Sequence, residues 1–284
     1  MTGFDLPGFD LAAFIEATLA EDLGGVADAS RDLTANACLA PDARLSAVLD
    51  SRDAVVVAGL PIAAAFFRRL DPDCRVELLA ADGDAVAAGA DLMRVEGNAR
   101  ALLAAERSAL NTLQHLCGIA TLTRAYVAAI AGTGCTLLDT RKTLPGLRML
   151  EKYAVRMGGG SNHRMGLWDA PMVKDNHIAA AGGVTEAVAA CKAAGLSHIT
   201  VEVDRLDQIE PALAAGADRL LLDNMKPPML REAVALVAGR VPTEASGGVN
   251  LETIRGIAET GVTFVSVGRI TQSAPAADVG MDFA

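Results

Sequence analysis

Aromatic residues make up only 4% of this chain, and no apolar run approaches the ~20 residues that a membrane-spanning helix needs. The amino-terminal segment has no basic region and carries acidic residues throughout, which argues against a secretory signal peptide. The five cysteines are widely spaced and include no C-x-x-C pair, so neither a disulfide scaffold nor a zinc ribbon is expected. We therefore expect a cytoplasmic protein that has no membrane segment and keeps its cysteines as buried, reduced thiols.

Positive charge is scarce as well, since the chain has a formal net charge of −10. Many of its cations are gathered in residues 138–178, which contain DTRKTLPGLRMLEKYAVRMGGGSNHRMG and then PMVKDNHI. An acidic chain that concentrates cations in one segment builds a local pocket for an anion and not a broad basic face. Nucleic acid is therefore not expected as a partner, whereas a small polyanionic substrate is.

The chain has 284 residues, 51% of them hydrophobic, which suffices for one large α/β barrel or for a smaller barrel with an accessory domain. Up to about residue 115 the sequence mixes strand-like and helix-like segments, and a helical pattern runs from Ala99 to about Ile130. After Gly134, six short apolar runs alternate with amphipathic segments, as in parallel βα units. Because a full barrel has about eight such units, we expect an open or incomplete barrel.

The change from mixed segments to regularly alternating strands and helices divides the chain into two domains. We place a first domain at residues 1–115 and the α/β barrel at residues 116–271. The tail, residues 272–284, is too short for another βα unit, so we expect it to return to the first domain. No low-complexity segment or strong internal repeat interrupts this division.

Polar or glycine residues fall at the ends of all six predicted barrel strands. The loops after the carboxyl ends of parallel strands open on one face of a barrel, so such residues meet at one site. One of them alone would mean little, since Asp is a common helix N-cap. The residues are Asp139 to Lys142 after the first strand, Lys174 after the second, Glu202 in the third, Asp223 and Asn224 after the fourth, Glu244 to Gly248 around the fifth, and Gly268 after the sixth.

Two of these strand ends carry glycines that fit a phosphate. Glycine lets backbone N–H groups approach an anion closely, and the loops after the last two strands of a barrel commonly hold phosphate. The glycine pair alone is weak evidence, but the basic segment strengthens it. The two predicted phosphate loops are Ser246–Gly247–Gly248 and Val267–Gly268–Arg269.

Glu202 and Asp223 have the spacing of adjacent strands and not of one helix face. Two such carboxylates could hold a Mg²⁺ ion that also touches substrate oxygens. An ion pair with Lys174 or Lys142 accounts for the same carboxylates equally well.

The four histidines do not have the spacing of a metal site. His163 lies in a glycine-flanked turn beside Arg164, and His177 follows Lys174, so these two are candidates for substrate contact. His115 and His198 are expected to be structural.

The segments DTRKTLPGLRMLEKYAVRMGGGSNHRMGL and KDNHI resemble the quinolinate phosphoribosyltransferase family, and the likeness extends from EDLGG through AERSALNTLQHLCGIAT and VEVD to LLLDN, EASGGV and SVG. The resemblance implies an N-terminal α/β sandwich domain and an open α/β barrel, assembled as a homodimer with higher oligomers left open. It also implies transfer of phosphoribose from phosphoribosyl pyrophosphate to quinolinate with loss of CO₂. The products are nicotinate mononucleotide and pyrophosphate, on the de novo route to NAD. Mg²⁺ would accompany phosphoribosyl pyrophosphate, and no organic cofactor is implied.

The resemblance also implies residue roles. Arg107 of AERSALN would complete the active site of the neighbouring subunit. Catalytic roles fall to Lys142, Lys174, Glu202 and Asp223, the last two also toward ribose and Mg²⁺. Substrate binding falls to Arg107, Thr140, Arg141, Lys142, His163, Arg164, Lys174, Glu202, Asp223, Ser246, Gly247, Gly248, Val267, Gly268 and Arg269.

Two positions depart from the family pattern. Arg269 stands where the family has alanine, and Gln272 stands where it has histidine or lysine. A cation at position 269 either reinforces the phosphate loop or points outward, and the sequence does not decide between these two roles.

Three other functions remain open from the sequence. A related protein encoded with molybdenum uptake systems shares the DTRK and GGG-x-x-HR sequence patterns. The intact KDNHI segment argues against assigning this chain to that protein. A Schiff-base aldolase would use Lys174 as its nucleophile, which leaves the other cations unexplained. A non-enzymatic anion-binding protein would bind quinolinate without turnover.

Overall fold

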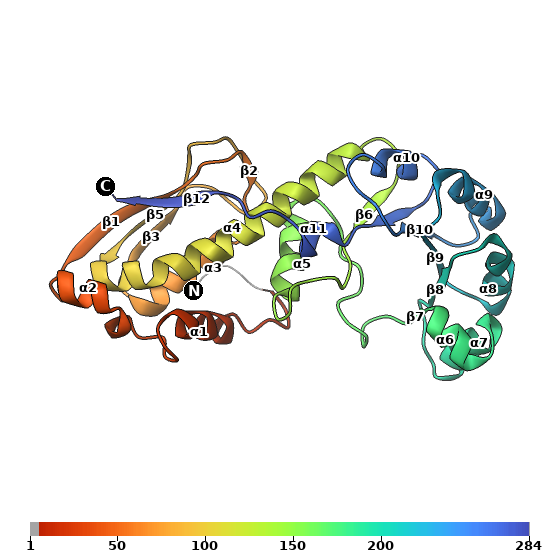
Figure 1. Cartoon of the computed structure of the whole chain (residues 1–284), viewed down its shortest axis with the longest axis horizontal. Coiled ribbons are helices and arrows are strands. Elements are labelled where there is room, and N and C mark those ends of the chain that lie inside the picture. Colours follow the sequence, from red (N-terminus) through yellow and green to blue (C-terminus); the bar gives the residue numbers. More distant parts are fainter. Residues whose placement is uncertain (1–5, 284) are drawn as a thin grey trace. The chain divides into compact units, whose positions relative to one another are not determined.

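The computed structural model describes residues 6–283, and its contacts divide the chain into two compact units (Figure 1). Of the described residues, the first unit contains 6–122, 149–159 and 274–283, and the second contains 123–148 and 160–273. The division that we predicted after residue 115 falls inside α4 (Ala99–Ala129), whose last turns belong to the second unit. Residues 149–159, which we had placed in the barrel domain, make their contacts in the first unit.

The first unit is built on a four-stranded antiparallel sheet in the order β12-β1-β5-β3. Its strands are β1 (Arg44–Ser51), β3 (Arg75–Leu78), β5 (Ala90–Asn98) and β12 (Val279–Phe283). The carboxyl-terminal strand β12 lies beside β1 in Figure 1 and pairs with it along its whole length. The tail therefore returns to the first unit, as the sequence predicted.

Helices and a small second sheet complete this unit. In α3 (Leu60–Leu70) the apolar side chains Phe66 and Phe67 are fully buried, and the helix opens with a proline in its first turn. The remaining elements are α1 (Leu11–Asp22), η1 (Ala29–Arg31), α2 (Leu33–Cys38), β2 (Val55–Val56) paired with β4 (Ala85–Val86), and α5 (Arg148–Met157).

His115 of α4 has a structural role in this unit, as expected. Its Nε2 lies 2.9 Å from Oε1 of Glu151, a carboxylate on α5 that is fully buried. A buried carboxylate needs such a partner, because leaving it without one would cost several kcal/mol. The pair therefore helps to hold α5 against α4 inside the first unit.

The second unit contains a six-stranded parallel sheet in the order β6-β11-β10-β9-β8-β7. The first strand pairs with the last one, which is the connection that closes a barrel. Ser161 adds one parallel bridge to Leu138 on the other side of β6, and no pairing joins this segment to β7 within the described residues. The barrel is therefore open at this gap, in agreement with the predicted fold. The strands are β6 (Thr136–Leu138), β7 (Met172–Val173), β8 (Thr200–Val203), β9 (Arg219–Asp223), β10 (Thr243–Ser246) and β11 (Phe264–Ser266).

Helices follow the strands of this sheet on its outer side (Figure 1). Alternate strand residues such as Val201, Leu220, Leu222 and Val265 are fully buried. The intervening residues face the interior, because side chains alternate along a strand. Two short helices were not expected from the sequence, α6 directly after β7 and α11 after β11. The helices are α6 (Asp175–Ala181), α7 (Val184–Ala193), η2 (Leu206–Gln208), α8 (Ile209–Ala215), α9 (Pro227–Val237), α10 (Ile254–Ala258) and α11 (Arg269–Gln272).

All five cysteines are free, as predicted, but only two of them are buried. Burial raises the pKa of the Cys117 thiol to about 12 and also raises the pKa of Cys74, so both are poor nucleophiles. Cys38 is exposed, so the expectation of buried thiols was wrong for this residue. None of the described helices is both long enough and apolar enough to cross a membrane.

Candidate active site

A cavity of about 740 Å³ opens at the carboxyl ends of the parallel strands in the second unit. The strand residues that line it are spaced by two, for example Leu221 and Asp223 on β9 and Glu244 and Ser246 on β10, so they share the interior face. Every site residue that the family resemblance implies, except Arg107, lines this cavity. They are Thr140, Arg141, Lys142, His163, Arg164, Lys174, Glu202, Asp223, Ser246, Gly247, Gly248, Val267, Gly268 and Arg269, and Gln272 lines it as well.

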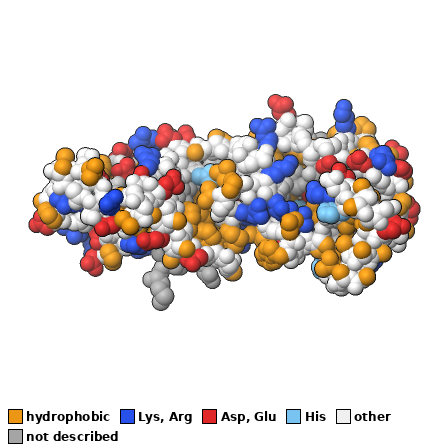
Figure 2. Space-filling model, turned by 60° about the horizontal axis from the view of Figure 1, so that its bottom comes forward, with side chains coloured by type: hydrophobic (Ala, Val, Ile, Leu, Met, Phe, Trp, Pro, Cys, Tyr) orange, Lys and Arg blue, Asp and Glu red, His pale blue; other side chains and the backbone are white. Residues whose placement is uncertain are grey.

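Five cations line the cavity: Arg141, Lys142, Arg164, Lys174 and Arg269. Burial and the neighbouring Arg141 guanidinium lower the pKa of Arg164. Nε of Arg141 is buried and has no hydrogen-bond partner among the described residues. Two guanidinium groups held together, one with an unsatisfied donor, form a site that an anion would stabilise. Figure 2 shows Lys and Arg side chains gathered on one face near a His side chain.

Arg148 belongs to the same basic segment but does not line the cavity. Its guanidinium donates to Oγ1 of Thr143 at 3.1 Å and to the carbonyl oxygens of Met165 at 3.1 Å and Arg141 at 3.4 Å. These bonds join the loop after β6 to the loop that follows Arg164. Arg148 therefore holds the two arginine-bearing loops together.

The predicted carboxylates lie on neighbouring strands, Glu202 on β8 and Asp223 on β9. Nζ of Lys174 lies 2.8 Å from Oε2 of Glu202, so the ion pair that the sequence left open is present. Burial, and after it the Glu202 charge, raise the pKa of Asp223. Asn224 Nδ2 donates to Asp223 Oδ2 at 2.6 Å, which orients that carboxylate.

The carboxylates suit a metal ion that is carried mainly by a substrate. No group of three or more His, Cys, Asp or Glu side chains that could hold a metal occurs in the part of the chain that the structure describes. Mg²⁺ commonly takes only one or two protein carboxylates and fills its other positions with phosphate oxygens and water. Glu202 and Asp223 fit that pattern of two protein carboxylates. They do not fit a metal site whose ligands all come from the protein.

Both predicted phosphate loops line the cavity, and the backbone of the first one favours glycine. Gly247 and Gly248 have φ angles of +96° and +62°, in the left-handed region that favours glycine. A Cβ on Gly247 would overlap Oδ1 of Asn224 and lie 3.0 Å from its backbone nitrogen. A Cβ on Gly268 would lie 2.8 Å from Cδ of Lys142. Backbone N–H groups at these positions are therefore open to close approach by a phosphate.

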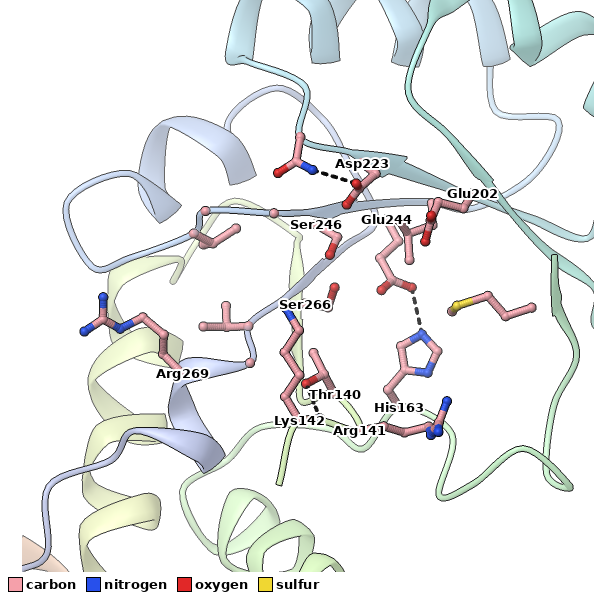
Figure 3. A pocket seen from close by; sticks show the side chains of 18 of the residues that line it. Thr140, Arg141, Lys142, His163, Glu202, Asp223, Glu244, Ser246, Ser266 and Arg269 are labelled. Carbon is pink, nitrogen blue, oxygen red and sulfur yellow. Dashed lines mark hydrogen bonds and ion pairs between the residues drawn. The ribbon is translucent and has the colours of Figure 1, made fainter. Parts of the chain in front are cut away.

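His163 lines the cavity, but neighbouring groups of the protein engage its ring (Figure 3). Its Nδ1 accepts the backbone N–H of Arg164 at 2.7 Å, and its Nε2 lies 3.2 Å from Oε2 of Glu244. Its backbone N–H donates to the fully buried Asp139 at 2.8 Å, so Asp139 orients the turn and does not face substrate.

His177 does not line the cavity, and its ring Nδ1 accepts the backbone N–H of Lys174 at 3.0 Å as part of a helix cap. The prediction that His177 contacts substrate is not supported by this position. His198 lies at a second cavity, at the amino ends of the strands, where a structural role remains the simplest interpretation.

Some residues that line the cavity were missing from the predicted site. Glu244 and Ser266 face the interior from neighbouring strands β10 and β11. Glu244 was noted in the sequence only as a strand-end carboxylate, because its partners come from other strands. Met172, Leu221, Val249 and Asn250 also line the cavity.

Two predicted positions differ from the rest. Arg107 lies on an exposed part of α4 in the first unit and is not among the residues that line the cavity. Arg269 lines the cavity but is exposed, and Figure 3 shows its guanidinium directed away from Lys142, whose side chain extends into the cavity.

The fold and the cavity define an open α/β-barrel protein with a cationic site for a small polyanion. Comparison with known families agrees: "Quinolinate phosphoribosyl transferase, C-terminal domain" matches residues 119–282, and its N-terminal domain matches residues 32–117. The chain belongs to the quinolinate phosphoribosyltransferase family.

Named relatives point the same way. The chain is 42% identical to "Nicotinate-nucleotide pyrophosphorylase [carboxylating], chloroplastic" of Arabidopsis thaliana, over 97% of this chain and 83% of that protein. It is 45% identical to "Probable nicotinate-nucleotide pyrophosphorylase [carboxylating]" of Bacillus subtilis, over 80% of this chain and 79% of that protein. The solved structure of NadC from Streptococcus pyogenes matches with a TM-score of 0.92 and 38% identity, over 99% of this chain and all of that one.

Proposed function

We propose that this protein transfers the phosphoribosyl group of phosphoribosyl pyrophosphate to quinolinate and releases CO₂, pyrophosphate and nicotinate mononucleotide. This places it in the de novo biosynthesis of NAD. The observation that carries the proposal is the convergence of five cations on a cavity that also contains the Glu202–Asp223 pair. A polyanionic phosphoribosyl donor and a dicarboxylate acceptor together require this charge.

Quinolinate binds at the deeper basic wall. Arg141 and Arg164 pair with its two carboxylates, because planar guanidinium groups match carboxylates in a bidentate geometry. Lys174 adds a third charge, and the His163 ring forms the adjoining wall. The pyridine nitrogen is thereby oriented toward the ribose.

Phosphoribosyl pyrophosphate binds across the open end of the barrel. The loops of Gly247, Gly248 and Gly268 receive its 5′-phosphate through backbone N–H groups. Glu202 and Asp223 accept hydrogen bonds from the ribose hydroxyls. When bound with this substrate, Mg²⁺ screens the pyrophosphate charge, and the same two carboxylates would hold it together with substrate oxygens.

In the reaction the bond between ribose C1 and the pyrophosphate oxygen breaks, and positive charge develops on the ribose. Glu202 and Asp223 stabilise that charge, and Lys142 stabilises the negative charge on the leaving oxygen. The pyridine nitrogen then bonds to C1 and becomes a pyridinium. The adjacent carboxylate leaves as CO₂, its electron pair stays on the ring carbon next to the cationic nitrogen, and a proton replaces it.

We also propose a homodimer in which Arg107 of each subunit reaches the cavity of its partner. The proposal rests on the AERSALN motif and on the exposed position of Arg107, outside the residues that line the cavity of its own chain. The cytoplasmic location stays a prediction, because the Arabidopsis relative is named as chloroplastic.

The direct test is incubation of pure protein with quinolinate, phosphoribosyl pyrophosphate and Mg²⁺, with nicotinate mononucleotide and CO₂ as the measured products. Omission of each component in turn is the control. Binding of quinolinate without formation of the mononucleotide would indicate an anion-binding protein and overturn the proposal.

A further inference from the structure

Glu244 is a buried carboxylate in the wall of the site that the proposed reaction does not use. It lies on β10, its side chain is fully buried, and it faces the barrel interior. Its register neighbours are Leu221 on β9 and Phe264 on β11. An ionised carboxylate in such a place needs partners, because its desolvation is expensive.

Two partners meet Glu244 at the same oxygen. His163 Nε2 and Arg219 Nη1 each lie 3.2 Å from Oε2 (Figure 3 shows the histidine contact). Arg219 is two residues before Leu221 on β9, so it shares the interior face, and its guanidinium stacks 4.3 Å from the centre of the Phe264 ring. Arg219 is thus fixed as a counter-ion beneath the carboxylate.

The contacts of His163 determine its protonation. Nδ1 accepts the backbone N–H of Arg164, so it carries no proton. The ring proton therefore lies on Nε2, the nitrogen that faces Glu244. The Glu244 oxygen that faces Nε2 accepts from a proton at that position, so the tautomer rests on the Arg164 contact and the Glu244 contact together. These two contacts give the His163 ring a fixed orientation between Arg164 and the barrel interior.

We infer that Glu244 is a positioning residue, which holds the His163 ring on the wall of the site as the Nε2–H tautomer while Arg219 balances its charge. The wall of the site then offers a flat ring in a fixed orientation to a planar substrate. This inference rests on the proposed function for its kinetic readout only, since the state of the His163 ring can be observed without turnover.

The test uses protein labelled with ¹⁵N at histidine and long-range ¹H–¹⁵N correlation spectra. His163→Gln assigns the signal by removing it from among those of the four histidines. The wild type should show the Nε2–H pattern for His163. Glu244→Ala should lose it, whereas Glu244→Gln, which keeps an acceptor oxygen, should retain it.

The kinetic constants of the variants should change in the same order as their His163 spectra. Glu244→Ala should raise KM for quinolinate and lower kcat/KM by about 10- to 100-fold, as for other carboxylates that orient a functional histidine, with KM for phosphoribosyl pyrophosphate little changed. Glu244→Gln should restore most of the loss. Asp218→Asn is the matched control, because Asp218 bonds to the backbone of Ile199 in the same unit and should affect neither readout.

An unchanged His163 pattern in Glu244→Ala would overturn the inference, and so would an altered pattern with normal kinetics. If Glu244→Ala does not fold, the comparison of Glu244→Gln with Arg219→Met decides. Arg219→Met removes the counter-ion but keeps the Glu244 carboxylate as acceptor, and it should perturb the His163 signal. An unperturbed His163 signal in Arg219→Met contradicts the inference. A wild type that shows the tautomer but no turnover of quinolinate would overturn the proposed function alone.

Discussion

Lys174 Nζ and Glu202 Oε2 are 2.8 Å apart, so these two cavity residues form an ion pair before any substrate is bound. Because the Lys174 amine is held by a carboxylate, it is not free to act as a nucleophile. This disfavours the hypothesis of a Schiff-base aldolase. The pair also keeps the Glu202 carboxylate in place beside β9, where its register neighbour Leu221 lies two residues before Asp223. A substrate that brings its own carboxylate or ribose hydroxyls can then exchange partners with the pair.

Substrate choice should depend on the carboxylate next to the ring nitrogen. Nicotinate lacks that group, and its binding would leave a buried guanidinium in the Arg141–Arg164 pair without a partner. We expect kcat/KM for nicotinate to be at least ~100-fold below that for quinolinate. Steady-state assays with both acids and the same phosphoribosyl donor give the ratio, and comparable values would contradict the assignment.

Lys142→Ala and Arg164→Ala should each lower kcat/KM by at least ~100-fold, about 3 kcal/mol, as when a charged group is removed from a desolvated site. Neither side chain is part of the apolar core, so circular dichroism should remain unchanged. Lys226→Ala, an exposed lysine at the start of α9, is the matched control and should keep normal activity. Near-normal activity in both cavity variants would remove these residues from the site.

Gly247→Ala should be far more damaging than Gly248→Ala. Both positions have positive φ, but a Cβ on Gly247 would overlap Asn224, whereas one on Gly248 would meet nothing within 4 Å. We expect Gly247→Ala to raise KM for phosphoribosyl pyrophosphate and to cost about 1–3 kcal/mol of stability, and Gly248→Ala to cost less than half of that. Thermal unfolding and substrate titration check both, and equal effects would show that the Asn224 contact is unimportant.

Glu244→Gln should change the pH dependence of stability. Burial raises the pKa of Glu244, but the hydrogen bonds from His163 and Ser266 and the charge of Arg219 outweigh it, so that the pKa lies below its ordinary value of 4.5. A carboxyl with a lowered folded pKa contributes stability that is present above its unfolded pKa and is lost as the pH falls through the folded one. The wild type should therefore lose its advantage over Glu244→Gln below pH 4.5 and keep it at higher pH. Urea unfolding at a series of pH values measures the difference, and a difference that persists unchanged in acid would exclude the ion pair as its source.

A shared active site predicts recovery of activity when two inactive variants are mixed. Arg107→Ala and Lys142→Ala chains should each be nearly inactive alone. A mixed dimer rebuilds one site with both wild-type residues and loses both in the other, so activity should approach about a quarter of wild type when half of the dimers are mixed.

The alternative arrangement gives a different result. If each chain supplies its own Arg107, every site in the mixture lacks one residue and no activity returns. Subunit exchange must be shown independently, for example by mass spectrometry of differently tagged chains. Exchange without recovery then refutes the shared site.

Local patterns were enough to predict the alternation of strands and helices after Gly134 and the return of the tail to the first unit. α6 was missed because DNHIAAA has no apolar periodicity and follows a strand of only two residues. The segment of residues 149–159 was assigned to the barrel because it lies between two barrel segments in the sequence. Its partners, such as His115 on α4, are distant in sequence and become visible only in the fold.

The sequence by itself determined which chemical groups are present and that they follow strand ends: the basic segment, the carboxylates Glu202 and Asp223, and the glycine loops. Parallel strands bring such groups to one face whatever the details of packing, so the cavity could be inferred without coordinates. Only the tertiary structure decided which groups pair with each other. Glu244 meets Arg219 because the register of β9 and β10 places Arg219 two residues before Leu221, the register neighbour of Glu244, and it meets His163 because the loop after Ser161 brings that ring to the same oxygen. Such contacts depend on strand register and loop path, which sequence spacing does not encode.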